Sequence, residues 1–233
     1  MILWLQLVLV LAGLVLVRLV YLLVAIQATS RRKDGAQVVG TKRKGPANTM
    51  IVMGSGGHTA EMLQIVEQLD FAKYAPREYV IAEADKTSVV KVIDVEVRRE
   101  PDLAKQQYEI VTITRSRHVH QGYFSSIFTT LMAVANSIPV VLRSRPDLIL
   151  TNGPGTCVPI CLVAFLSKLF FINRNCKIVF VESFCRVKSL SLSGQILQWI
   201  TDLFVVQWPG LASTAANGSA LGRKKEYFGR LSS

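Results

Sequence analysis

One short segment of this sequence combines glycines, hydroxyl groups and a histidine in a way that suits anion binding. Gly54-Ser55-Gly56-Gly57-His58-Thr59 follows an apolar run and precedes a stretch with helical spacing. Glycines there let backbone N–H groups approach an anion, and the start of a helix adds partial positive charge. With the hydroxyl donors of Ser55 and Thr59, these groups predict a diphosphate site. The segment is neither a Walker A motif, because it has no Lys-Ser/Thr pair, nor a dinucleotide fingerprint, because it has no GxGxxG spacing. The alternative is a tight turn that packs a helix on a sheet.

A second glycine segment and a charged segment lie further along the chain. Asn152-Gly153-Pro154-Gly155-Thr156 and Glu182-Ser183-Phe184-Cys185-Arg186 each follow a short apolar run. Arg186 can pair with a phosphate, and Glu182 can accept the proton of a sugar hydroxyl. Alternatively, Glu182 supports a helix N-cap or pairs with Arg186. The predicted ligands of the diphosphate and its sugar are Gly54, Ser55, Gly56, Gly57, Thr59, Asn152, Gly153, Gly155, Thr156 and Arg186.

The remaining pattern explains how these segments would be positioned. Short apolar runs at 49–53, 79–82, 108–112, 148–151, 177–181 and 203–207 read as strands, and 58–69, 86–95, 158–170 and 191–200 read as helices. This alternation predicts an α/β domain with a Rossmann-like parallel sheet covered on both faces. In such sheets ligands bind at the carboxyl ends of the strands, where the glycine segments fall.

Residues 124–138 need separate treatment, because they form an uncharged amphipathic helix. One face carries Phe124, Ile127, Phe128, Leu131, Ala135 and Ile138, and Pro139 stands at its end. An ordinary core helix explains this pattern. A helix lying against a membrane beside the binding site is the alternative.

The first 27 residues predict a transmembrane anchor. Residues 2–26 are apolar except for Gln6 and Arg18, and a helix of that length, about 37 Å, spans a bilayer core of about 30 Å with some tilt. Arg18 lies near enough to the end of the span to snorkel outward. A cleaved signal peptide would need a basic start, which is absent. Residues 28–48 read as a basic flexible linker that holds the following domain, 49–233, in the cytosol.

The net charge and the cysteines indicate which kinds of ligand and which cellular compartment to expect. The formal net charge is +11, which fits an anionic partner, and the sequence has no nucleic-acid module, so a membrane surface or phosphorylated ligand is favoured over nucleic acid. The four cysteines form no CxxC pair, and no metal site is expected. Buried free thiols suit a reducing compartment.

Several separated motifs resemble one family, the membrane-anchor subunit of the eukaryotic UDP-N-acetylglucosamine transferase of the dolichol pathway. They cover residues 50–231 and are Met53-Gly54-Ser55-Gly56-Gly57-His58-Thr59-Ala60-Glu61-Met62, Thr151-Asn152-Gly153-Pro154-Gly155-Thr156-Cys157-Val158-Pro159-Ile160-Cys161, Val181-Glu182-Ser183-Phe184-Cys185-Arg186 and Val206-Gln207-Trp208-Pro209. The first loop also looks like that of the bacterial peptidoglycan GlcNAc transferase, a two-domain GT-B enzyme. The resemblance therefore implies that residues 49–233 form the acceptor half of a GT-B fold.

The resemblance further implies an anchor in the endoplasmic reticulum or nuclear membrane that recruits a soluble catalytic subunit. That partner would bind most of the UDP-GlcNAc donor, so no cofactor is expected in this chain. Together the two would add a second GlcNAc, β1,4-linked and with inversion, to GlcNAc-diphospho-dolichol on the cytosolic face, within a larger assembly of dolichol-pathway enzymes. His58 and Glu182 are the candidate catalytic residues. The family's tail, which binds the partner, matches Tyr227, Phe228, Gly229, Arg230 and Leu231.

Two other functions remain open. In the first, the chain is a non-catalytic recruitment scaffold whose glycine loops are only structural. In the second, it is a self-sufficient enzyme acting on a phosphorylated lipid. A GT-B active site lies between two domains, and about 190 residues after the anchor and linker suffice for one α/β domain, so we expect the second half to come from another chain.

Overall fold

A six-stranded parallel sheet organises the chain in the computed structural model, which describes residues 2–30, 43, 45–113, 123–153, 156–213, 225–229 and 231. The order is β3-β2-β1-β4-β5-β6, and every neighbouring pair is parallel. The strands are β1 (Thr49–Val52), β2 (Arg77–Ala82), β3 (Tyr108–Ile113), β4 (Leu148–Asn152), β5 (Lys177–Val181) and β6 (Leu203–Val205). The strands after β1 are added on one side of it as far as β3, and those from β4 onward are added on its other side. The topological switch point therefore lies between β1 and β4, which is where doubly wound sheets bind ligands. The predicted Rossmann-like α/β class is confirmed.

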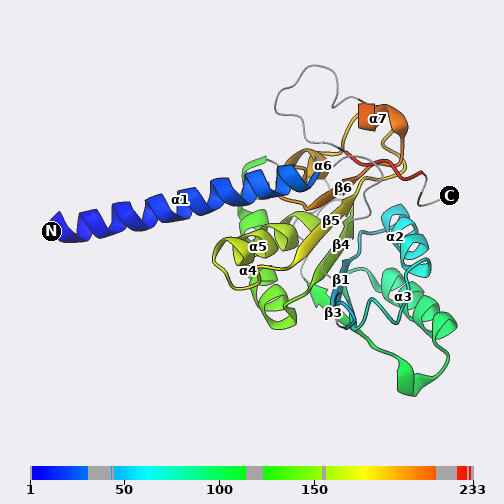
Figure 1. Cartoon of the computed structure of the whole chain (residues 1–233). Helices are drawn as coiled ribbons and strands as arrows, with labels where there is room; N and C mark the ends of the chain where they lie inside the picture. The colour runs from blue at the N-terminus through cyan, green and yellow to red at the C-terminus, as the bar shows by residue number, and fades with distance from the viewer. Residues whose placement is uncertain are drawn as a thin grey trace.

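Helices cover both faces of the sheet (Figure 1). On one face, α2 (Gly57–Glu67) and α3 (Lys86–Arg99) pack on a core that includes Ile51, Met62 and Tyr79. On the other, α4 (Tyr123–Ser144) and α5 (Cys157–Leu169) pack on a second core. The shorter helices are η1 (Leu103–Lys105), α6 (Leu192–Leu197) and α7 (Pro209–Ser213). The predicted strands and helices are therefore all present, with ends displaced by a few residues.

A buried ion pair fixes α3 to the sheet. Arg77 on β2 donates through Nε and Nη2 to the two oxygens of Glu96 on α3, at 2.7 and 2.8 Å. The Tyr79 hydroxyl also donates to Glu96, at 2.6 Å, and the Arg77 guanidinium lies 3.6 Å from the Phe71 ring centroid. Because each charge has several partners, this pair is satisfied and marks structure rather than a ligand site.

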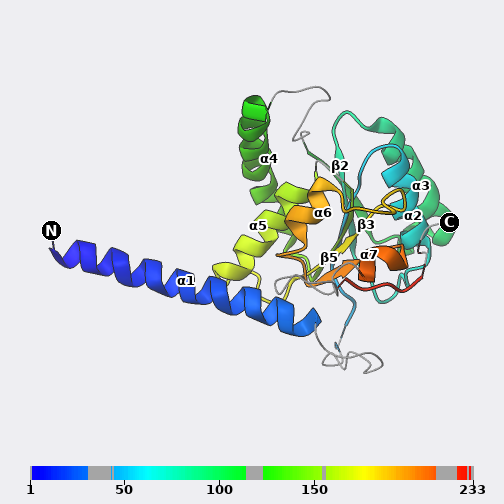
Figure 2. The ribbon, with the colours of Figure 1, turned by 90° about the horizontal axis from the view of Figure 1, so that it is seen from above.

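Helix α1 (Ile2–Ser30) projects away from the domain (Figures 1 and 2). Its segment Trp4–Ala28 is long and apolar enough to cross a membrane. Leu22 and Ile26 near its end are buried in the core that holds α5. The helix continues through Ser30, three residues past the predicted anchor. Residues 31–42 and 44 of the predicted linker lie outside the described residues, whereas Ala47 already bonds to Lys73 O, at 2.7 Å.

Helix α4 differs most from expectation. It runs through Pro139 to Ser144, where the proline was expected to end it. The face toward the domain is made of Ala133, Ser137 and Val141, while Leu131 and Ile138 are exposed. The interpretation of Leu131 and Ile138 as core residues is therefore wrong: small side chains let α4 approach α5 closely, and the larger apolar ones point away. The side chains of Phe124, Ile127 and Phe128 lie outside the described residues.

Candidate functional site

The two glycine loops meet at the switch point of the sheet. Strands β1 and β4 are neighbours, with Val52 opposite Thr151, so the segments that follow them emerge side by side at the carboxyl edge. Gly56 is the N-cap residue of helix α2, and its φ of 64° is in the left-handed region that favours glycine. No side chain among the described residues caps α2, and Ser55, Gly56 and Gly57 are exposed. The start of this helix is therefore open to an anion, and the diphosphate site stays a prediction.

His58 lies between the two loops and explains two of the glycines. A Cβ added at Gly54 would come within 2.5 Å of His58 Cβ, and one at Gly153 within 2.8 Å of His58 Cγ. Gly153 also has a φ of 96°, which strains any residue with a side chain. The imidazole thus fills the space that these glycines leave. Gly155 and Pro154 of the second loop lie outside the described residues.

Two buried polar atoms at this junction are without hydrogen-bond partners among the described residues. They are Nδ1 of His58 and Oδ1 of Asn152. Orphaned buried groups cost free energy unless a ligand, water or ion satisfies them. Their position beside the open helix start is the strongest sign of a ligand site in the described part of the chain.

Glu61 organises the junction, and the sequence analysis gave it no role. Its Oε1 accepts a hydrogen bond from Ser183 Oγ at 2.8 Å, and its Oε2 accepts from Asn152 Nδ2 and Phe184 N, both at 3.3 Å. One carboxylate therefore joins α2 to the ends of β4 and β5. The signal that could have found it is spacing: Glu61 stands three residues after His58, on the same face of α2.

Thr59 and Thr156 were predicted as ligands, and the structure gives them internal positions. The Thr59 hydroxyl donates to Gly54 O at 2.7 Å and lies 2.7 Å from Ser88 Oγ. It therefore ties the first glycine loop to helix α3. Thr156 is the N-cap residue of α5 and is buried, without a side-chain capping bond. Asn152 is buried as well, and only its Oδ1 is left for a ligand.

Glu182, a predicted catalytic base, is fully buried and supports a helix cap. Its Oε2 accepts from Ser191 N at 3.0 Å and Ser191 Oγ at 3.1 Å, and its Oε1 accepts from Ser183 N at 3.1 Å. Ser191 is the N-cap of α6, and its Oγ accepts from Gly194 N. The N-cap alternative therefore describes its contacts, and no ion pair joins it to Arg186. In this structure Glu182 is a positioning residue rather than an exposed base.

Arg186 and the C-terminal tail occupy exposed positions near this edge. Arg186 is exposed, and its backbone N–H bonds to Ser183 O at 2.9 Å, which tightens the turn that presents it. The tail pairs beside β6 through a parallel bridge between Val205 and Glu226. Tyr227 and Phe228 are then exposed, while Leu231 N bonds to Gln207 Oε1 at 3.3 Å. Arg230 lies outside the described residues.

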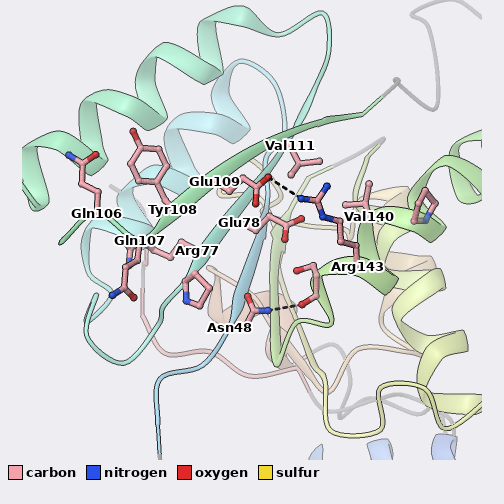
Figure 3. Close-up of a pocket in the computed structure, with 13 residues that line it drawn as sticks. Asn48, Arg77, Glu78, Gln106, Gln107, Tyr108, Glu109, Val111, Val140 and Arg143 are labelled. Carbon is pink, nitrogen blue, oxygen red and sulfur yellow. Dashed lines mark hydrogen bonds and ion pairs between the residues drawn. The ribbon is translucent and has the colours of Figure 1, made fainter. Parts of the chain in front are cut away.

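A separate cavity of about 660 Å³ opens at the opposite, amino edge of the sheet (Figure 3). Glu78 and Glu109 face Arg143 there, with Arg143 Nη2 4.0 Å from Glu109 Oε1. Asn48 Nδ2 donates to Ser144 O at 2.7 Å. Burial raises the pKa of Glu78, the nearby Glu109 charge adds to this, and the charge of Arg143 lowers it less.

The described residues contain no reactive buried thiol and no metal cluster. Burial raises the pKa of Cys157 and Cys176 to about 12 and that of Cys161 well above its usual value. Cys185 is the exposed cysteine. No group of three or more His, Cys, Asp or Glu in the described ranges could hold a metal ion. Phosphate charge at the carboxyl edge would therefore meet amides, a helix start and Arg186.

Comparison with known proteins identifies the family. The model of a family described as oligosaccharide biosynthesis protein Alg14 like matches residues 49–231, which contain the whole sheet and both glycine loops. The chain belongs to the Alg14 family.

Individual relatives agree with this assignment to the Alg14 family. A rat protein named UDP-N-acetylglucosamine transferase subunit ALG14 is 49% identical over 75% of this chain and 81% of its own length. The Schizosaccharomyces pombe protein of the same name is 40% identical over 84% of this chain and 89% of its own. Crystalline MurG of Acinetobacter baumannii aligns with 78% of this chain and 45% of that one, at 15% identity and a TM-score of 0.49, which is too slight a likeness to carry an argument.

Proposed function

We propose that this Alg14-family chain is the membrane-anchored, acceptor-binding subunit of a UDP-GlcNAc transferase. The enzyme adds the second GlcNAc, β1,4-linked, to GlcNAc-diphospho-dolichol on the cytosolic face of the endoplasmic reticulum. Relatives named as UDP-N-acetylglucosamine transferase subunits support the activity, and α1 supports the membrane location. The observation that carries the proposal is the junction at the switch point, where an uncapped helix start lies beside the unpartnered atoms of His58 and Asn152.

The diphosphate would lie on the exposed backbone from Ser55 to Gly57, with Arg186 closing over it as a charged partner. Its sugar would point toward His58. In the reaction, the acceptor hydroxyl oxygen bonds to the anomeric carbon of the donor GlcNAc, and the bond from that carbon to UDP breaks with inversion. His58 is the candidate to take the hydroxyl proton, because its Nδ1 is unpartnered within the described part of the chain.

The donor half would come from a soluble partner subunit. This chain supplies one Rossmann-like domain, and a GT-B active site is built between two. The tail offers a contact for that partner, because its pairing with β6 leaves the Tyr227 and Phe228 rings in solvent. Exposed aromatic side chains are frequent anchors of protein interfaces. A larger assembly with neighbouring dolichol-pathway enzymes would form around the same anchor.

A recruitment scaffold is the second candidate, and two observations favour it. Thr59 and Glu182 make internal hydrogen bonds, so part of the predicted site stabilises the domain itself. In that case the partner would supply all of the chemistry, and the glycine loops would be turns. The self-sufficient enzyme is the third candidate, and the same assay addresses all three.

The test is transfer of GlcNAc from UDP-GlcNAc to a short-chain GlcNAc-diphospho-lipid by the full chain in vesicles, with and without its co-purified soluble subunit. We expect no transfer by this chain alone and transfer when the subunit is added. Replacing both Tyr227 and Phe228 by Ala should weaken subunit binding at least about 30-fold, as for an interface hot spot. Leu103→Ala, an exposed apolar residue elsewhere, is the control. Transfer by the purified chain alone would overturn the two-subunit proposal.

A further inference from the structure

The side of the domain that carries α4 exposes an unusual amount of apolar surface. The apolar surface consists of Leu131, Met132 and Ile138 on α4, and Phe170, Phe171 and Ile172 in the turn after α5, which are 43–63% exposed. From Tyr123 to Leu142 helix α4 carries no charged residue, whereas α3 on the other layer carries Lys86, Lys91, Asp94, Glu96, Arg98 and Arg99. Contiguous apolar patches on a protein surface mark partner or membrane contacts.

The helix and the turn that carry the apolar surface lie on the side of the domain from which α1 projects. In Figures 1 and 2, α4 and the end of α5 lie on the side of the domain toward the N-terminal half of α1. Both views show α4 running across the axis of α1 rather than along it. If α1 spans a bilayer, α4 therefore lies in the plane of that bilayer. An uncharged helix in this orientation has the geometry of an interfacial helix.

The length of the free part of α1 places the domain close to the hydrocarbon. Residues Trp4 to Val17 are all exposed, and contact with the domain begins at Arg18 and Leu19. With Ile2 and Leu3 of the same helix, 16 residues precede Arg18 and span about 24 Å at 1.5 Å each. A bilayer core is about 30 Å thick, so a core that contains this whole segment leaves no wide gap between the membrane and the domain. The near side of the domain then lies at the interfacial layer, together with the end of α1.

A basic cavity lies at that depth. A space of about 370 Å³ between α1 and the domain is lined by Arg18, Tyr21, Lys168, Phe171, Arg174, Lys177 and Asp202, among others. Arg18 donates through Nη2 to Lys168 O at 3.3 Å and stacks 4.2 Å from the centroid of Phe171, so it reaches the domain instead of open water. Its Nε has no partner among the described residues.

The charges of this cavity leave a cationic surplus. Asp202 is engaged by Lys168 and Lys177, while Arg18 and Arg174 face no carboxylate partner within the described ranges. Arginine and aromatic side chains are the groups that settle at the headgroup layer of a membrane. A phospholipid phosphate matches both the charge and the depth.

We propose that the apolar surface docks into the bilayer that α1 spans, with α4 as an in-plane interfacial helix and a phospholipid phosphate held over Arg18 and Arg174. This second membrane contact goes beyond the proposed function, because it requires neither the acceptor nor the transfer reaction. It would fix the height and tilt of the domain relative to the bilayer.

The test uses the full chain in phosphatidylcholine–phosphatidylserine vesicles, without any other subunit. In a Cys185→Ser background, the three remaining cysteines are buried with raised pKa values, so an added cysteine is labelled selectively. Leu131→Cys and Phe170→Cys would carry an environment-sensitive fluorophore. Val90→Cys on α3, exposed to 66% on the opposite layer, is the matched control.

Lipids bearing a nitroxide near the headgroup should quench the labels at 131 and 170 at least about two-fold and leave the label at 90 nearly unchanged. Quenching at 131 and 170 that does not exceed quenching at 90 would overturn the proposal. So would labels that stay bright in vesicles and become shielded only when the soluble subunit is added, because a protein would then be the occupant of the surface.

Discussion

The two edges of the sheet differ in what surrounds their unsatisfied polar atoms. At the amino edge, a cavity of about 660 Å³ is lined by Arg143 and Glu109, which face one another, and by Asn48, which bonds to Ser144 O; the Ser144 Oγ is buried without a partner among the described residues. At the carboxyl edge, His58 Nδ1 and Asn152 Oδ1 are buried without partners among the described residues, and they lie beside an uncapped helix start. Unpartnered polar atoms beside an open helix start point to the carboxyl edge, where a doubly wound sheet binds its ligands.

Of the substitutions that test the carboxyl edge, Gly153→Ala should lower turnover the most. The added methyl group would meet the His58 ring at 2.8 Å, and the φ of 96° strains any side chain. Displacing both the loop and the imidazole should lower the turnover of the complex about 1,000-fold. Gly210→Ala is the matched control, since nothing lies within 4 Å of its added Cβ. Normal turnover by Gly153→Ala, measured in the vesicle assay, would count against a site at this edge.

His58→Ala should rank second, with turnover about 100-fold lower and binding of the soluble subunit unchanged. The reason is loss of the group that takes or donates a proton near the acceptor hydroxyl. Turnover that survives His58→Ala intact would favour the recruitment scaffold instead.

Arg186→Gln and Arg143→Gln place the same substitution at the two edges. Loss of a charged partner for the diphosphate should raise the KM for the lipid acceptor about 10-fold in Arg186→Gln, with kcat nearly constant. Arg143→Gln should leave both constants unchanged, because its neighbour Glu109 belongs to the amino edge. Equal changes of KM in the two variants, or a larger change in Arg143→Gln, would contradict a diphosphate site at the carboxyl edge.

The fold was largely predictable because its signal is periodic. Apolar runs that end in glycine-containing segments located the six strands of the sheet and the helices between them. The parallel arrangement followed from the alternation of strands and helices. The exception, α4, shows the limit of that signal. Its apolar residues have helical spacing, but spacing cannot say whether the larger ones face a core or a membrane, and the small Ala133 and Ser137 face the domain.

The site was predictable only in part, because a residue type does not reveal the direction of its side chain. Gly54, Gly153, His58 and Asn152 do converge, since parallel strands bring their carboxyl ends together. Glu182 accepts hydrogen bonds from the N-cap residue Ser191 and does not face the junction. A buried carboxylate is stable only where hydrogen-bond donors such as amides and hydroxyls surround it. Glu61, which joins three elements, could have been recognised only by its spacing from His58 on the same face of α2, because its residue type alone is that of many surface positions.

Glu78→Gln should give the smallest effect, on stability rather than activity. The pKa of Glu78 is raised in the folded state, mainly by burial, so the folded chain binds more protons than the unfolded chain between the unfolded and folded pKa values. The free energy of unfolding therefore falls as pH rises through that window. Removing the carboxylate should raise Tm slightly at pH 7, and less at pH 4. A variant that loses stability at pH 7, by thermal unfolding in detergent, would contradict this assignment.

The most direct test of the carboxyl-edge site is binding of a short-chain GlcNAc-diphospho-lipid to the full chain without its partner, followed by NMR. With isotope-labelled histidine and glycine, we expect the ligand to shift the His58 ring and the amides of Gly56 and Gly57, and Gly153→Ala to abolish these shifts. Shifts confined to residues around Glu78 and Arg143, with His58 unmoved, would place the ligand at the other edge and contradict the account.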